Sequence, residues 1–143
     1  MGLENIRVVT QSSCAATDSA LANTLTGNAK AVLHEVATLL DALAQRGETG
    51  VIDLGGMPLS QADKTWLIEK LGQGEVEMML DLAGASQIRE TAFHGVWWLI
   101  HRNENNVVSG EFIEVNRVPD LVLAHADDIR RSAESLKLLV SEA

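Results

Sequence analysis

Three residues of the sequence have side chains suited to acid–base catalysis: Glu90, His94 and His101. A carboxylate beside an imidazole can move a proton when the two groups hydrogen-bond directly or through one water. An even separation on one strand places Glu90 and His94 on the same face, whereas the odd step to His101 places the two imidazoles on opposite faces. A bulge at Gly95 would undo this alignment. A small enzyme built on these three residues is one hypothesis.

Other catalytic and metal-binding patterns are missing from the sequence. The four histidines do not stand in a spacing such as HxxxH, which directs two imidazoles to one metal. No GxSxG, Walker or GxGxxG motif follows a strand candidate. Cys14 is the only cysteine, so the chain alone forms neither a disulfide nor a thiolate cluster. We therefore expect a protein that is not an enzyme and that carries no metal and no cofactor.

The composition is that of a folded protein, with 46% hydrophobic and 22% charged residues in 143. Twenty acidic residues against 11 basic ones give a net charge of −9, which would repel nucleic acid. The charge suits a basic protein partner, although solubility alone also explains it. Because the start lacks a basic and apolar leader and no apolar run is long enough to span a bilayer, we expect no membrane insertion and a cytoplasmic location.

The spacing of apolar residues predicts the secondary structure that must position these side chains. Residues 1–27, rich in Ser, Thr and Ala, are expected to be a connector with room for one short helix, and residues 28–143 a single domain. Helices are predicted from Asn28, a candidate N-cap, to Gly47, from Ser60 to Leu71, and after Pro119. Ser60 and Asp63 stand in capping-box spacing.

Strands are predicted between these helices, with a turn over residues 103–106. The strand candidates cover residues 51–54, 75–82, 88–93, 96–102 and 107–118. This order of elements predicts an α+β fold. We expect a mostly antiparallel sheet of three to five strands, with about three helices packed mainly on one face.

The tandem Trp97 and Trp98 are the most informative feature, because neighbours on a strand point to opposite faces of a sheet. If Trp98 faces the helices, Trp97 lies on a second, thinly covered face. We expect that face to be mixed in polarity, with Glu75, Glu77, Met79 and Asp81 on it. An exposed Trp ringed by polar groups is typical of protein interfaces.

The sequence therefore predicts a partner-binding surface around this strand. Its residues are Arg89, Glu90, Thr91, Gly95, Trp97, Trp98, His101 and Phe112. The N-terminal segment or a second copy of the chain would be alternative covers for the same patch. A structural homodimer is therefore a further hypothesis.

Residues 33–121 of the chain resemble the C-terminal domain of the HupH/HyaF family of hydrogenase expression and formation proteins. The strongest parts are Ile88-Arg89-Glu90-Thr91 followed by Gly95-Val96-Trp97-Trp98, together with Gly72-Gln73-Gly74-Glu75-Val76. The residues that carry the resemblance also include His34, Glu35, Asp53, Pro58, Gly74, Glu75, Ile88, Glu114 and Pro119.

The resemblance implies a non-catalytic chaperone in the maturation of [NiFe] uptake hydrogenases. Its expected client is the precursor of the iron–sulfur small subunit, bound in the cytoplasm before export and assembly, and other hydrogenase accessory proteins are further expected partners. Such a precursor would carry a basic signal sequence and its own iron–sulfur cluster. It would suit this chain, which is acidic and offers no set of cysteine ligands.

Overall fold

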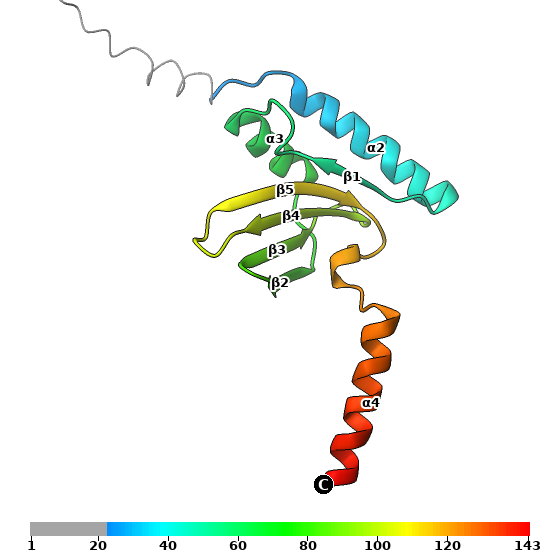
Figure 1. Ribbon diagram of the computed structural model, residues 1–143. Coiled ribbons are helices and arrows are strands. Elements are labelled where there is room, and N and C mark those ends of the chain that lie inside the picture. Colours follow the sequence, from blue (N-terminus) through cyan, green and yellow to red (C-terminus); the bar gives the residue numbers. More distant parts are fainter. Residues whose placement is uncertain (1–22) are drawn as a thin grey trace, which may run out of the picture.

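The computed structural model describes residues 23–143 (Figure 1). Cys14 and most of the predicted connector lie outside the described residues. The elements are α2 (Asn28–Arg46), β1 (Gly50–Asp53), α3 (Gln61–Leu71), β2 (Glu77–Asp81), β3 (Ala85–Glu90), β4 (Val96–Arg102), β5 (Val108–Val115), the 3₁₀ helix η1 (Asp120–Val122) and α4 (Ala126–Glu142). Across residues 23–143 these are three α-helices and one five-stranded antiparallel sheet, which confirms the predicted α+β fold.

The sheet has the strand order β1-β5-β4-β3-β2, and every neighbouring pair is antiparallel. Strands β2 to β5 form a meander, and β1 pairs with the outer edge of β5. The predicted turn after β4 is confirmed, because the side-chain oxygen of Asn103 accepts hydrogen bonds from the backbone N–H groups of Asn105 and Val107, both at 3.0 Å. Asn106 adopts the positive φ that such a turn favours.

One face of the sheet, here called the first face, is covered by α2 and α3 (Figure 1). Val96, Trp98 and Ile113 of the sheet meet the buried stripes of the two helices there, and the main core results. The predicted capping box is present: Ser60 Oγ accepts from the N–H of Asp63, whose carboxylate accepts from the N–H of Ser60.

The predicted N-cap of α2 is wrong by one residue. Gly27 occupies the cap position, and the Asn28 side chain instead donates to the carbonyl oxygen of Pro58 at 2.9 Å. This bond ties the start of α2 to the loop before α3. The helix ends as predicted at Gly47, which has the left-handed conformation of a C-cap glycine.

The opposite face, the second face, has a smaller core of its own. The strand register aligns Met78 with Ile88 and Ile88 with Leu99, so all three side chains lie on the side of Trp97. The prediction that Glu77, Met79 and Asp81 lie on this face is wrong, because the pairing of β2 with β3 places Met78 and Leu80 here instead. Ile88, Trp97 and Leu99 are buried, with Met78, Leu80 and Phe112 packed against them.

Helix α4 extends away from the sheet on the side opposite to α2 and α3 (Figure 1). The helix predicted after Pro119 is confirmed, but all of its residues are exposed and its apolar stripe does not pack on the sheet. The N–H of Asp120 at the start of η1 donates to Glu114 Oε1 at 3.0 Å, and Glu114 pairs with Trp97, so the segment before α4 is tied to the second face described above. Among the described residues, no helix combines the length and apolarity needed to cross a membrane.

Candidate protein-docking site

The loop after α3 and the β3–β4 turn are joined into one unit, here called the motif corner (residues 72–76 and 88–98). Backbone N–H groups of Ala92 and Gly74 donate to the carbonyl oxygens of Leu71 and Glu90, each at 2.9 Å. A Cβ atom at Gly74 would lie 2.5 Å from the carbonyl oxygen of Thr91 and 2.7 Å from Glu90 Oε2. Only glycine fits this approach. The segments that carry the family resemblance most strongly therefore pack against one another.

The carboxylate of Glu90 connects the two segments of the motif corner. Oε1 lies 3.0 Å from His94 Nδ1, and Oε2 accepts from the backbone N–H of Glu75 at 3.2 Å. The hydrogen bond with His94 lowers the pKa of Glu90, and the same bond raises the pKa of His94. The predicted pairing of these residues is present, although a turn and not an unbroken strand brings them together.

The proposed catalytic trio does not assemble. His101 Nδ1 lies 2.9 Å from Ser86 Oγ, and its ring centroid lies 5.5 Å from that of Phe112. Ser86, which pairs with His101, lies four residues from Glu90 on β3, a separation of about 13 Å. Because acid–base partners must be in hydrogen-bond reach, the enzyme hypothesis for these three residues is wrong. Within residues 23–143, no three His, Cys, Asp or Glu side chains cluster as metal ligands would.

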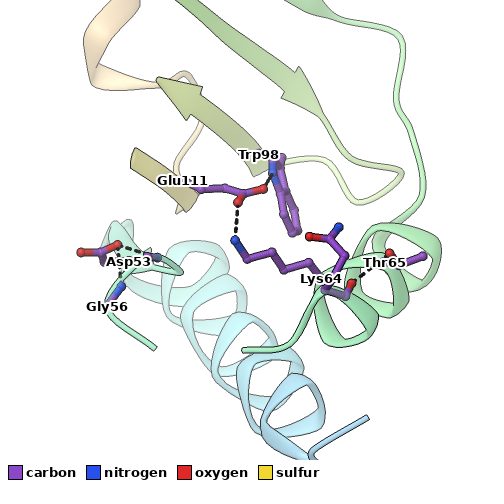
Figure 2. Close-up of polar contacts among 8 residues, drawn as sticks. Asp53, Gly56, Lys64, Thr65, Trp98 and Glu111 are labelled. Carbon is purple, nitrogen blue, oxygen red and sulfur yellow. Dashed lines mark hydrogen bonds and ion pairs between the residues drawn. The ribbon is translucent and has the colours of Figure 1, made fainter. Parts of the chain in front are cut away.

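The tandem tryptophans point to opposite faces as predicted, but neither is free for a partner. Trp97 is 5% exposed and Trp98 is 2% exposed. Trp97 Nε1 donates to the carbonyl oxygen of Asn116 at 3.0 Å. Trp98 Nε1 donates to Glu111 Oε1 at 3.0 Å, and Glu111 Oε2 binds Lys64 Nζ at 2.9 Å (Figure 2). The expectation of an exposed Trp97 is wrong because the second face has its own core.

The other residues of the predicted partner-binding surface are buried or only partly exposed. Glu90 and Thr91 are buried, whereas Arg89, Gly95, His101 and Phe112 are half-buried. The eight residues are buried or half-buried, so we expect an interaction surface in this region to draw mainly on their exposed neighbours.

An apolar groove of about 530 Å³ runs between α2 and the motif corner. It is lined by Leu33, Val36, Ala37, Leu40, Asp41, Ala44, Leu71, Phe93 and Val96. Phe93, on the β3–β4 turn, is 49% exposed. Gly95 has φ +90°, and a Cβ there would lie 3.3 Å from side-chain carbons of Leu40 and Leu43. The glycine thus lets the turn approach α2 closely.

Sequence reasoning missed the two walls of this groove. Leu33, Ala37, Leu40 and Ala44 repeat at helical spacing beside the buried Val32 and Val36, so α2 carries a second apolar stripe. The second stripe could be recognised from the sequence. The position of Phe93 could not, because it depends on the backbone hydrogen bond from Ala92 to Leu71.

The remaining residues of the resemblance support the fold. Asp53 Oδ1 accepts from the N–H groups of Gly55 and Gly56 at 2.9 and 3.2 Å and so shapes the turn after β1 (Figure 2). Ile88, Glu114 and Pro119 are buried, Gly74 is half-buried, and Glu75 lies exposed in the motif corner. Pro58 receives the Asn28 bond. His34 and Glu35 are exposed on α2.

The comparison with protein families matches residues 26–142 to the C-terminal conserved region of the HupH hydrogenase expression protein. The match contains both the groove and α4.

Individual relatives agree with this match. The chain is 42% identical to the solved hydrogenase expression protein HupH from Thiobacillus denitrificans, with a TM-score of 0.80 over 84% of this chain and 100% of that one. It is 32% identical to the hydrogenase expression/formation protein HoxQ of Azotobacter vinelandii over 77% of this chain and 40% of the relative. It is 31% identical to the hydrogenase-1 operon protein HyaF of Escherichia coli over 59% of this chain and 30% of the relative. The chain thus spans less than half the length of these two curated relatives.

Proposed function

The chain belongs to the family of HupH hydrogenase expression proteins, as their C-terminal conserved region, and from this premise we propose that it is an accessory factor of [NiFe] hydrogenase maturation that binds the small-subunit precursor. The binding takes place in the cytoplasm, before export and assembly. The chain holds its client and does no chemistry on it. The precursor keeps its own cluster ligands, since one cysteine cannot hold a cluster.

The observation that carries the proposal is the open apolar groove against the motif corner. A half-exposed Phe93 opposite Leu40 offers the kind of apolar surface that stays favourable only when a partner covers it. Grooves of this type accept an apolar helical or extended segment of another polypeptide.

Charge adds orientation to this contact. Asp41 lies in the groove wall, and the whole chain has a net charge of −9. A precursor segment with basic residues beside an apolar stretch would therefore be attracted and held in one direction. The motif corner fixes the shape of the groove, so residues that are themselves buried still determine binding.

Capture of the small-subunit precursor by the purified chain tests this proposal. Phe93→Asp and Ala37→Asp place a charge in the groove, and each should weaken binding at least about tenfold, because a desolvated charge replaces an apolar contact. Val107→Asp is the matched control, since Val107 is exposed on the β4–β5 turn, about 20 Å along the sheet from the groove residue Val96.

The variants must first show the parent's circular dichroism and thermal midpoint. The proposal is wrong if the groove variants hold the precursor as tightly as the parent does, or if Val107→Asp weakens binding by the same factor. Capture of another accessory protein in place of the precursor would also contradict it.

A further inference from the structure

The groove beside the motif corner has a buried floor and a stepped wall. The floor consists of three side chains that are at most 3% exposed: Val36, Leu71 and Val96. The α2 wall alternates large and small side chains at helical spacing: Leu33, Ala37, Leu40 and Ala44. Both alanines are exposed and lie seven positions apart, so they leave two hollows about 10 Å from each other on one side of α2.

The groove gives the backbone of an occupant few hydrogen-bond partners. Eight of its nine lining residues are apolar. The backbone of the turn is already paired, since the N–H of Phe93 donates to Thr91 Oγ1 at 3.2 Å and its carbonyl oxygen accepts from the N–H of Val96 at 3.1 Å. The carbonyl oxygen of Leu71 accepts from Ala92. An extended segment would therefore lie here with unpaired N–H and C=O groups, which is costly in apolar surroundings.

An α-helix avoids this cost, because its N–H and C=O groups pair within the helix itself. The α2 wall runs eleven positions from Leu33 to Ala44, which is about 16 Å or roughly three helical turns. A helix packed beside α2 can place two large side chains, seven residues apart, in the hollows over Ala37 and Ala44. The polarity and the shape of the groove thus both favour a helix.

Asp41 gives this wall its one charged contact. Its Oδ1 accepts from Gln45 Nε2 at 2.9 Å, and no salt bridge within residues 23–143 involves it. Arg46, further along α2, pairs instead with Glu48 at 2.9 Å. A Lys or Arg beside the apolar face of the occupant would therefore find a carboxylate without a cationic partner.

We propose that the groove takes an amphipathic α-helix of a partner protein, about three turns long, with large apolar side chains seven residues apart and a Lys or Arg that meets Asp41. This inference rests on the proposed function of the groove as a docking site, and it names the kind of segment that docks. The segment need not be helical before it binds, because packing of an apolar face supplies most of the stability of a helix.

Fluorescence anisotropy of the full chain with labelled model peptides tests this without the precursor. One peptide of about 18 residues, composed of Leu, Ala and Lys, has its Leu residues at helical spacing. The matched peptide has the same composition, with Leu at every second position as in a strand. The helical peptide should bind at least about tenfold more tightly. Equal affinities, or no saturable binding of the helical peptide up to about 1 mM, overturn the proposal.

Filling a hollow should exclude the helix. Ala37→Leu and Ala44→Leu should each weaken binding of the helical peptide at least about fivefold, because the added side chain occupies the space of the partner's. Ala31→Leu is the matched control, since Ala31 is exposed on the opposite side of α2. Unchanged binding in both hollow variants, or an equal loss in the control, contradicts the proposal.

Charge reversal tests the contact with Asp41. A helical peptide with Glu in place of Lys should bind the parent about threefold more weakly, as expected for an exposed ion pair, and Asp41→Lys should reverse this preference. Glu35→Lys changes the net charge equally but lies on the opposite side of α2, so the preference should persist. A preference that Asp41→Lys leaves unchanged contradicts the proposed contact.

These results are separable from the proposed function. Capture of the precursor with failure of the peptide tests would remove this inference alone. Binding of the helical peptide without capture of the precursor would support the helix-binding groove and contradict the proposed client.

Discussion

The two faces of the sheet bury neighbouring tryptophans by different means. On the first face, Trp98 is covered by two helices that add their own apolar stripes to the core. On the second face, none of the helices within residues 23–143 packs over Trp97, and a row of strand side chains covers the ring together with the segment after β5. The alternation of side chains along a strand correctly predicts that the two rings lie on opposite faces. It does not predict which later segments of the chain cover each ring.

The cover of Trp97 is a polar clasp formed by Glu114, Asn116 and Asp120. The carbonyl oxygen of Asn116 accepts from Trp97 Nε1, and its side-chain amide donates to Glu114 Oε1 and to Asp120 Oδ1, each at 3.1 Å. Glu114 and Asn116 are buried, and buried polar groups that are paired hold a segment in one position. On the second face, therefore, hydrogen bonds hold in place part of the cover that the two helices provide on the first face.

Alanine at either tryptophan gives the largest expected effect. Trp98→Ala and Trp97→Ala should each lower the free energy of unfolding by about 3–5 kcal/mol, because each removes a large ring from a packed site. Hydrogen exchange should then rise in α3 for the first variant and in residues 116–122 for the second. A loss below about 1 kcal/mol for Trp97→Ala would contradict a core on the second face.

Removing the clasp gives a smaller effect. Asn116→Ala should cost about 1–3 kcal/mol in urea unfolding, because Glu114 and Asp120 lose a buried hydrogen-bond partner. Asn28→Ala is the control, since it also removes a side-chain hydrogen bond, to Pro58, but at an exposed site. Equal losses in the two variants would show that the clasp is not what covers the second face.

The smallest effect is the pH dependence of the motif corner, beside the end of the second face. The Glu90–His94 pair contributes stability while both groups are charged. Because the pKa of Glu90 is lowered, its contribution is complete above its ordinary value of 4.5 and is lost as the pH falls through the lowered pKa. Because the pKa of His94 is raised, its contribution is complete below its ordinary value of 6.5 and is lost as the pH rises through the raised pKa.

NMR titration measures this directly. The pKa of His94 should fall in Glu90→Gln, and the stability difference between that variant and the parent should shrink as the pH rises above 6.5. An unchanged His94 pKa in Glu90→Gln would show that the pair does not form in solution.

The sequence predicted the elements whose signals are local. Strand β4 has its predicted bounds, Val96–Arg102, because turn residues stand on both sides of an apolar run. The Ser60–Asp63 capping box is equally local. Strand β3 was predicted at 88–93 but covers Ala85–Glu90, because residues 91–95 form the turn that bonds to α3.

The candidate site depends on tertiary contacts that no local pattern contains. The extra stripe of α2, with Leu40, was readable, but its partner Phe93 faces it only because Ala92 bonds to Leu71 and Gly95 lets the turn close. In the same way, the periodicity of α4 predicts an apolar stripe without showing whether it packs within its own chain. Burial of Trp97 likewise depends on Asn116, which lies 19 residues away.

Site-specific photocrosslinking tests most directly the claim that the groove, and not the tryptophan pair, is the docking surface. With p-benzoylphenylalanine in place of Phe93, the chain should crosslink to the hydrogenase small-subunit precursor in cells that make both, whereas the same group in place of Val107 should not. Equal yields from the two positions, or a precursor complex that forms without any crosslink from position 93, would contradict the account.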